Sequence, residues 1–137
     1  MPTLPTIGRR SEGGFTLIEL LIVIVVVGIL AVIAIPKFSN SKERAIVSQM
    51  RSDLRNMVTA QEAHMSDAQT YYNGPIPNAA LSYGPSGSNV VTLSGVTVSG
   101  WAATATSPST ARTCAIYIGA APPPAPATIE GIVACTN

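Results

Sequence analysis

The most prominent pattern in the chain is one long apolar run near its start. From Phe15 to Ile35 the residues are almost all apolar and include a single charged side chain, Glu19. About 20 apolar residues are enough for an α-helix to cross a bilayer, so the run predicts a membrane-spanning helix. A carboxylate at bilayer depth is costly. Glu19 therefore needs a partner or marks a functional site.

The helical pattern continues after Pro36, now with two different faces. A helix from Phe15 to about Ser66 would be about 75 Å long, which is too long for a compact domain of this size. Its first half must therefore lie in a membrane or against other molecules. Apolar side chains recur at steps of three and four residues, while charged side chains fall elsewhere on the helix and can stay solvated. The apolar positions are Ile46, Met50, Leu54, Met57, Val58 and Met65, and the charged positions are Arg44, Arg51, Arg55 and Glu62.

Gly28 and Pro36 are the two weak points of this helix. Pro36 has no N–H group and its ring crowds the carbonyl of Val32, so a bend or a local opening is expected there. Gly28 is unfavourable in a soluble helix, but membrane helices use glycine for close contacts. Two interpretations stay open: Gly28 marks a close helix–helix contact, or the segment from Gly28 to Pro36 can unwind.

The second half of the chain predicts a small antiparallel sheet. A loop rich in Pro, Gly and Asn spans Gly74–Gly87. Short β-branched runs follow, divided by Gly, Ser and Pro, so the fold class is α+β with the apolar stripe of the helix on one sheet face. Residues Ala121–Ala127 contain three consecutive prolines and predict a polyproline II connector on the surface. The expected strands are Val90–Leu93, Val96–Val98, Trp101–Thr106, Cys114–Ile118 and Ile129–Cys135.

Composition indicates a small core that needs a covalent cross-link for stability. After Asp67 the only charged residues are Arg112 and Glu130, and Ser, Thr, Gly, Ala and Pro dominate. Both cysteines, Cys114 and Cys135, lie in this half, downstream of the predicted membrane segment. An exported, oxidising location favours a disulfide between them, with two buried thiols as the alternative. Closing this loop would contribute about 3 kcal/mol to stability.

Nothing in the sequence predicts catalysis, a cofactor or a metal site. His64 is the only histidine and is expected at a helix surface or a helix–sheet contact, and Trp101 is expected in the core. The net charge is +1, without a basic stripe for nucleic acid. There is no phosphate-binding glycine loop and no metal-ligand spacing. Four helical carboxylates are mostly expected on a solvated face: Glu43, Asp53, Glu62 and Asp67.

The start of the apolar run resembles a known family. The residues Gly14-Phe15-Thr16-Leu17-Ile18-Glu19 are similar to the class III signal of type IV pilins and their pseudopilin relatives. The resemblance covers the leader and the whole N-terminal helix, including the later Gly28 and Pro36. In the head it extends only to the outline of helix, loop, strands and a cysteine pair near the C-terminus.

This resemblance implies a sequence of processing and assembly. A prepilin peptidase of the inner membrane would cleave between Gly14 and Phe15 and then methylate the new amine of Phe15. Assembly machinery in the inner membrane would draw the subunit out of the bilayer into a homopolymer. The implied parts are a removed leader (residues 1–14), a membrane and filament-core helix (15–36), an amphipathic helix entering the head (37–67), and a β head with a disulfide-closed C-terminal loop (68–137).

The resemblance also implies a cytoplasmic N-terminus before assembly. The positive-inside count favours the opposite orientation, because more basic residues follow the span than precede it. The resemblance overrides this count. The basic residues before the span are Arg9 and Arg10, and those after it are Lys37, Lys42, Arg44 and Arg51.

Glu19 is the expected assembly residue. After cleavage, its carboxylate in one subunit can meet the Phe15 amine of a neighbour, so that two costly charges offset each other. The alternative is a pair between Phe15 and Glu19 of the same subunit. The resemblance further implies that helicity between Gly28 and Pro36 can be lost on assembly.

Three functions compete. The first is a type IV pilus subunit that serves adhesion, twitching motility or DNA uptake in a surface filament. The second is a minor pilin or a pseudopilin of a type II secretion system, which is less favoured because no acidic calcium loop follows Asp67. The third is a membrane-anchored binding module that does not polymerise, and a simple anchor has no use for Glu19.

Overall fold

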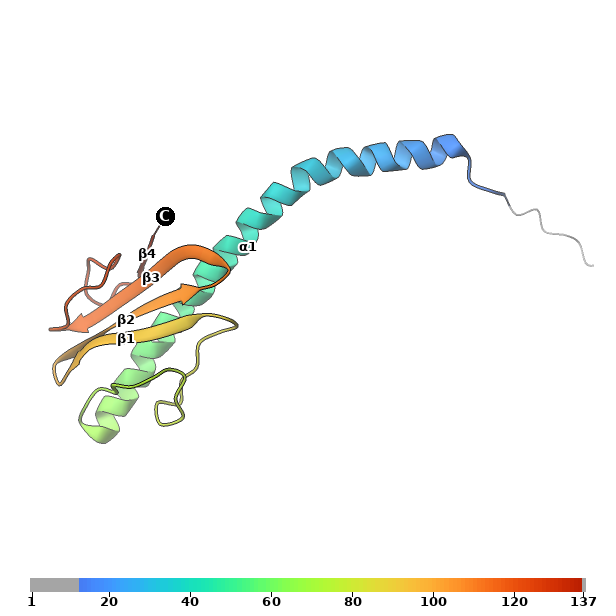
Figure 1. Cartoon of the computed structure of the whole chain (residues 1–137). Helices are drawn as coiled ribbons and strands as arrows, with labels where there is room; N and C mark the ends of the chain where they lie inside the picture. Colours follow the sequence, from blue (N-terminus) through green and yellow to red (C-terminus); the bar gives the residue numbers. More distant parts are fainter. Residues whose placement is uncertain (1–12, 137) are drawn as a thin grey trace, which may run out of the picture. The chain divides into compact units, whose positions relative to one another are not determined.

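One long helix followed by a four-stranded sheet makes up the protein (Figure 1). The computed structural model describes residues 13–136; the predicted leader residues 1–12, with Arg9 and Arg10, lie outside the described residues. The order of elements confirms the predicted α+β class. The structure divides between Phe38 and Ser39 into an N-terminal segment and a second unit, which we call the head. The elements are α1 (Leu17–Ala68), β1 (Val90–Thr97), β2 (Gly100–Ser107), β3 (Thr110–Gly119) and β4 (Ala134–Cys135).

The helix α1 keeps helical backbone through both predicted weak points. All 52 residues from Leu17 to Ala68 are α-helical, including Gly28 and Pro36. The backbone of the single subunit therefore does not open at Pro36. The helix ends at Gln69, which adopts a left-handed φ of 57° and donates its N–H to the carbonyl of Met65 at 2.9 Å. This C-terminal cap closes the last turn close to the predicted end.

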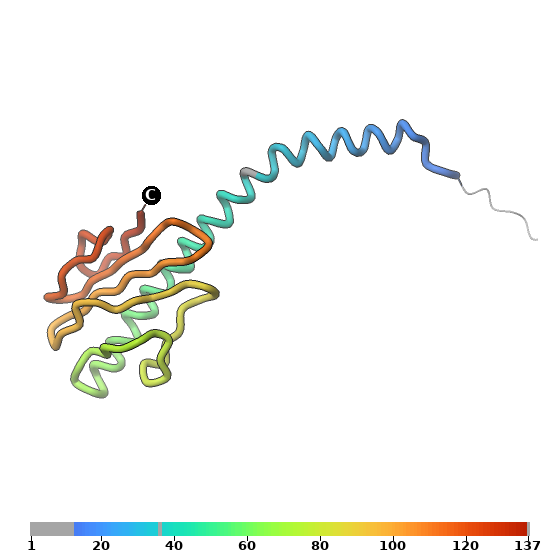
Figure 2. Tube along the Cα trace, viewed as in Figure 1, coloured from blue at the N-terminus to red at the C-terminus, as the bar shows by residue number. Residues whose placement is uncertain are grey.

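The four strands form one antiparallel sheet in the order β1-β2-β3-β4. Each strand therefore pairs with its neighbour in sequence. Residues 69–89 lie on the β1 side of the sheet and the C-terminal segment lies on the β3 side (Figure 2). The last predicted strand was too long, because only Ala134 and Cys135 pair with β3.

The boundary predicted between the first two strands is wrong. The structure joins the runs on either side of Gly95 into the single strand β1, with a register shift between Ser94 and Thr97. Gly95 has a φ of 57°, and a Cβ atom there would lie 3.0 Å from Cδ of Pro122. Glycine thus serves as a bulge with a close approach of backbone and loop, rather than as a strand breaker. The proline-rich segment is anchored on this side by the buried Ala121, while Pro122 and Pro123 are exposed.

The core of the head lies between one face of α1 and one face of the sheet. Met50, Leu54 and Met57 are fully buried, as the apolar stripe predicted. They pack with Trp101 and with other small or branched side chains of β2 and β3, among them Ala103, Ala105, Cys114 and Ile116. Full burial of one such large side chain contributes about 1.5–3 kcal/mol. Alanines on the central strand leave room for the helix, and Trp101 fills the remaining volume.

Candidate assembly site

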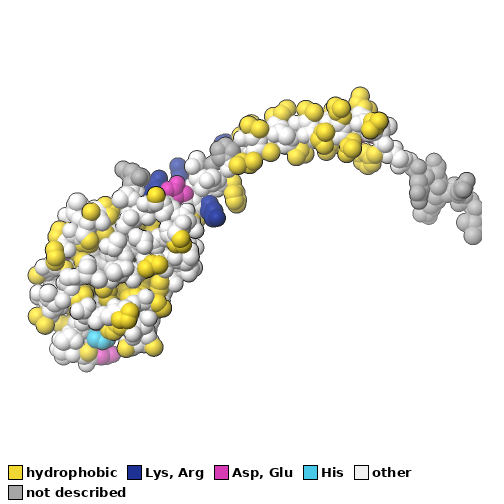
Figure 3. Space-filling view, in the orientation of Figure 1, with side chains coloured by type: hydrophobic (Ala, Val, Ile, Leu, Met, Phe, Trp, Pro, Cys, Tyr) yellow, Lys and Arg dark blue, Asp and Glu magenta, His cyan; other side chains and the backbone are white. Residues whose placement is uncertain are grey.

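The N-terminal segment is an unusually exposed apolar surface. Every large apolar side chain between Phe15 and Ile35 is at least 51% exposed. Figure 3 shows this band of apolar side chains on the helix. Among the described residues, α1 is the one helix that is long and apolar enough to cross a membrane, judged by length and composition. Soluble monomers rarely expose so large an apolar patch, so this surface is built for a bilayer or for other helices.

Thr16 and Glu19 form a capping box at the start of α1. Oε2 of Glu19 accepts hydrogen bonds from the backbone N–H of Thr16 at 2.9 Å and from its hydroxyl at 2.7 Å. In return, the hydroxyl oxygen of Thr16 accepts the backbone N–H of Glu19 at 3.3 Å. The sequence signal was the spacing Thr-x-x-Glu at a helix start, which the sequence analysis missed. A carboxylate in this apolar helix thus has local partners before any neighbour arrives.

The predicted cleavage and assembly residues lie together. Gly14, Phe15 and Glu19 line, with Gly13, a shallow hollow of about 210 Å³. Residues 13–16 precede the helix and are exposed. The peptide bond between Gly14 and Phe15 is therefore in an accessible, non-helical stretch. Farther along, Gly28 has open space around it, since an added Cβ would meet no atom within 4 Å.

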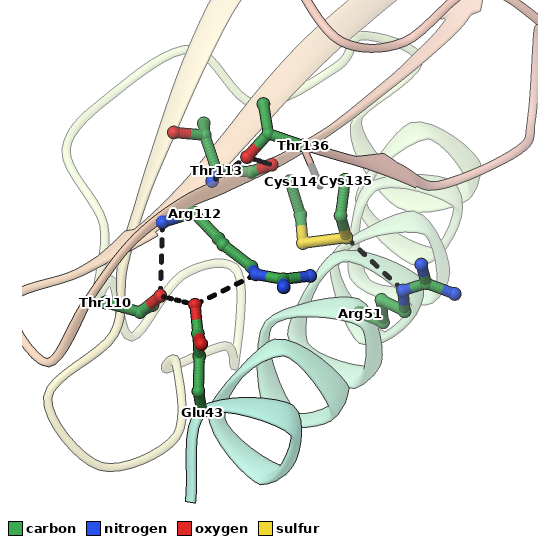
Figure 4. Close-up of a disulfide and its surroundings, with 8 residues drawn as sticks. All are labelled: Glu43, Arg51, Thr110, Arg112, Thr113, Cys114, Cys135 and Thr136. Carbon is green, nitrogen blue, oxygen red and sulfur yellow. Dashed lines mark hydrogen bonds and ion pairs between the residues drawn. A yellow bond between two sulfur atoms is a disulfide. The ribbon is translucent and has the colours of Figure 1, made fainter. Parts of the chain in front are cut away.

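The two cysteines form a disulfide that joins β3 to β4. Cys114 is fully buried, and its bond to Cys135 closes the C-terminal loop. Nε of Arg51 donates to Sγ of Cys135 at 3.3 Å (Figure 4). The disulfide therefore fixes a strand of only two residues against the sheet, and the hydrogen bond from Arg51 links the same strand to α1.

Glu43 pairs with a strand residue instead of facing only solvent. Its Oε1 accepts Nε–H of Arg112 at 2.9 Å and the hydroxyl of Thr110 at 3.1 Å (Figure 4). Both partners come from β3. The pair is about one-third exposed, so it aligns the helix and the strand more than it stabilises them.

Asp53 is the clearest correction to the predicted solvated face. It is 1% exposed, and Oδ1 accepts both the N–H of Ser86 at 3.1 Å and its hydroxyl at 2.7 Å. Oδ2 accepts Nδ2–H of Asn89 at 2.8 Å. Three donors from the loop before β1 thus compensate for burying the charge. Sequence periodicity could not supply these partners, because they lie more than 30 residues away.

Gln61 was not singled out from the sequence, yet it is fully buried and holds the chain after α1. Its Nε2 donates to the carbonyl of Tyr72 at 3.0 Å, and its Oε1 accepts the N–H of Tyr72 at 2.8 Å. His64 contacts the same region, with Nδ1 2.8 Å from the carbonyl of Thr70 and an edge-to-face contact with Tyr72. The histidine thus lies at a contact between helix and loop. Among the described residues, no three metal-ligating side chains come together.

Two structural features describe this class of protein. The first is a head in which one helix packs on a small sheet, and the second is an exposed apolar helical segment with a capped carboxylate at its start. Residues 9–35 match the family model described as the prokaryotic N-terminal methylation motif. In this N-terminal part the chain is similar to type IV pilins and to type II secretion pseudopilins.

Three relatives illustrate this similarity. The chain is 45% identical over 58 residues to the type IV major pilin protein PilA of Myxococcus xanthus, covering 42% of this chain and 26% of that protein. It is 44% identical over 61 residues to the type IV major fimbrial protein FimA of Dichelobacter nodosus, covering 44% and 39%. It is 33% identical over 63 residues to the type II secretion system core protein G of Pseudomonas aeruginosa, covering 46% and 44%. The matches thus span less than half the length of each relative.

Proposed function

We propose that this chain is the structural subunit of a type IV pilus and polymerises through the N-terminal segment of α1. The observation that carries the proposal is the exposed apolar surface from Phe15 to Ile35, interrupted by one capped carboxylate. In the bilayer this surface faces lipid, and in a filament it packs against the same surface of other subunits. Before assembly the subunit resides in the inner membrane with its N-terminus in the cytoplasm, and it then enters the surface filament.

Processing precedes assembly in this proposal. A prepilin peptidase cleaves between Gly14 and Phe15 and methylates the amine of Phe15. The exposed, non-helical backbone of residues 13–16 supports access by a protease. Cleavage leaves the N-terminus one residue before the capping threonine and creates an ammonium group beside the carboxylate of Glu19.

The Glu19 carboxylate has two successive roles. Before assembly, the hydrogen bonds from Thr16 satisfy it within the subunit. During assembly, it pairs with the Phe15 amine of a neighbour, because two unlike charges in an apolar environment offset each other only when both are placed correctly. A subunit in the wrong register leaves both charges unpaired, so the pair selects the register.

The segment from Gly28 to Pro36 is proposed to lose helicity on assembly. In the single subunit this stretch is helical. Pro36 supplies no N–H to the helix, which lowers the cost of opening it there. Freed backbone groups would need partners in the filament core. A density map of the filament with continuous helix from Ala31 to Ile35 would remove this part of the proposal.

A second candidate function is an accessory subunit, either a minor pilin or a type II secretion pseudopilin. The similarity to the secretion protein G of Pseudomonas aeruginosa favours it. Such a subunit shares the helix packing and differs in abundance and location. Shearing filaments from the surface of the encoding bacterium and identifying their main protein separates the two. This chain as the dominant protein supports the pilus subunit, and its scarcity in the fibre supports the accessory role.

Replacing Glu19 tests the role of its carboxylate in polymerisation. We expect Glu19→Ala to reach the membrane in normal amounts and to yield few or no filaments. Membrane and sheared fractions from the same cells are compared by immunoblot, so a loss of protein is distinguished from a loss of assembly. Normal filament yield from this variant contradicts the proposed role of the carboxylate.

A further inference from the structure

Charge is segregated along the helix of the head. Arg44, Arg51 and Arg55 lie in its first part together with the carboxylates of Glu43 and the buried Asp53, whereas the part from Glu62 to Asp67 has acidic residues but no Lys or Arg. Figure 3 shows Lys and Arg atoms gathered at one end of the head, with an acidic group among them, and His and further acidic atoms at the other end. One end of the head is therefore predominantly basic and the other is acidic.

The basic end has a defined hollow. Arg44, Arg51 and Arg112, together with Val47 and Ser48, line a depression of about 310 Å³ between α1 and β3. Two of the guanidinium groups are held at Nε: that of Arg112 by Glu43 at 2.9 Å, and that of Arg51 by Sγ of Cys135 at 3.3 Å (Figure 4). Their Nη groups make no hydrogen bond within the part of the chain that the structure describes. Three guanidinium groups and one carboxylate leave this hollow positive, with donors arranged for a second carboxylate.

The acidic end has a carboxylate that the subunit itself does not explain. Asp67 is exposed and makes no ion pair with any other described residue. It lies in the last turn of α1, where the helix dipole disfavours a negative charge. Such a group gains most from a cation supplied by another molecule.

We propose that Asp67 of one subunit binds in the arginine hollow of a neighbouring subunit in the filament. This inference rests on the proposed function, since it requires polymerisation. The two patches are different surfaces of the same chain, so the contact is heterologous and propagates into an open helical polymer. Between parallel helices, the 16 to 23 residues that separate Asp67 from Arg51 and Arg44 correspond to an axial offset of about 24–35 Å.

A charge exchange tests the contact directly. Arg44 is exposed, and its side chain makes no hydrogen bond or ion pair with another residue in the described part of the chain. We expect Arg44→Glu and Asp67→Arg each to lower the yield of sheared filaments by at least about tenfold, because each brings like charges together. The variant with both changes restores the opposite pair, and its yield should return to within about threefold of the unmodified chain. Lys42→Glu is the matched control, because it makes the same charge change outside the hollow and should leave the yield unchanged.

The outcomes separate this inference from the proposed function. If both single variants assemble normally while Glu19→Ala does not, polymerisation stands and the Asp67 contact is refuted. A double variant no better than either single variant also refutes it. If filaments sheared from cells that make the unmodified chain do not contain it, the proposed function fails. Should a charge-reversed chain be missing from the membrane fraction, Arg44→Gln and Asp67→Asn replace it, with a smaller loss of filaments expected from each.

Discussion

Thr16 and Glu19 hydrogen-bond to each other in both directions at the first turn of α1. These hydrogen bonds give the only carboxylate of the apolar segment polar partners within the single subunit. It also raises a question that the sequence alone did not pose, because capping and the proposed intersubunit pairing both use the same carboxylate. Any test of Glu19 must therefore separate its hydrogen bonds from its charge.

Asp53 is expected to be essential for the stability of the head. Asp53→Ala removes the acceptor for three donors of Ser86 and Asn89, which should lower the free energy of unfolding by about 2–3 kcal/mol. The emission of Trp101, the only tryptophan and fully buried, reports unfolding of the full chain by urea in detergent. Asp67→Asn on the exposed side of the same helix is the control and should change stability by less than about 0.5 kcal/mol. Equal effects of the two variants would contradict a stabilising role for the hydrogen bonds between Asp53 and the loop before β1.

Reduction of the disulfide should loosen the C-terminal loop and lower stability. The two cysteines are 21 residues apart, for which loop closure contributes about 3 kcal/mol. Because β4 is only two residues long, the loop is otherwise joined to β3 mainly by single hydrogen bonds, such as that from the N–H of Gly131 to the carbonyl of Tyr117 at 3.0 Å. We expect the urea midpoint of Trp101 emission to fall when reductant is added. In the variant Cys114→Ala/Cys135→Ala the reductant should have no effect, and an unchanged midpoint in the original chain argues against a stabilising disulfide.

Tyr83 should make the stability of the head depend on alkaline pH. Burial, and in addition the negative charge of Asp53, raise the pKa of Tyr83, whose hydroxyl donates to the backbone carbonyl of Asp53 at 3.0 Å. The unfolded chain ionises this tyrosine near pH 10, before the folded chain does. The stabilising contribution is therefore complete below about pH 10 and is lost as the pH rises toward the folded pKa.

Urea titrations at several pH values from 8 to 11 measure this loss. The slope that Tyr83 contributes should approach about 1.4 kcal/mol per pH unit between its two pKa values. Tyr83→Phe should be less stable at pH 8, because it lacks the hydrogen bond, but should lose less stability on going to pH 11. Parallel curves for the two proteins rule out this linkage.

The sequence was sufficient to predict the main elements of the fold. The apolar run and the stripe through Met50, Leu54 and Met57 predicted a long helix and the face that packs on the sheet. These patterns are local and repeat with the helical period, so they can be read without knowledge of partners. The expected disulfide pairing of the two cysteines is also present in the structure.

The burial of the polar residues on the same helix face could not be predicted from local periodicity. Asp53 and Gln61 look like solvated residues until the loop that supplies their partners is placed. Gly95 looked like the end of a strand because a bulge and a break share the same residue type. In each case the deciding contact is distant in sequence, so a local pattern does not contain it.

The assembly site was predicted only in part. Glu19 was selected because a charge in an apolar run needs a partner, but the partner within the subunit, Thr16, was overlooked. The spacing Thr-x-x-Glu was visible in the sequence. The roles of Phe15, Gly28 and Pro36 in the filament depend on neighbouring subunits and remain predictions.

The filament yield of Glu19→Gln tests the central claim most directly. Glutamine at this position of a capping box still bonds to the threonine, so the start of α1 and membrane insertion should be preserved while the charge is lost. Thr16→Val is the matched variant, because it keeps the charge and removes the hydroxyl bonds. The account predicts that Glu19→Gln accumulates in the membrane and yields few filaments, whereas Thr16→Val still assembles. Abundant filaments from Glu19→Gln would show that the carboxylate serves only as a helix cap and would contradict the account.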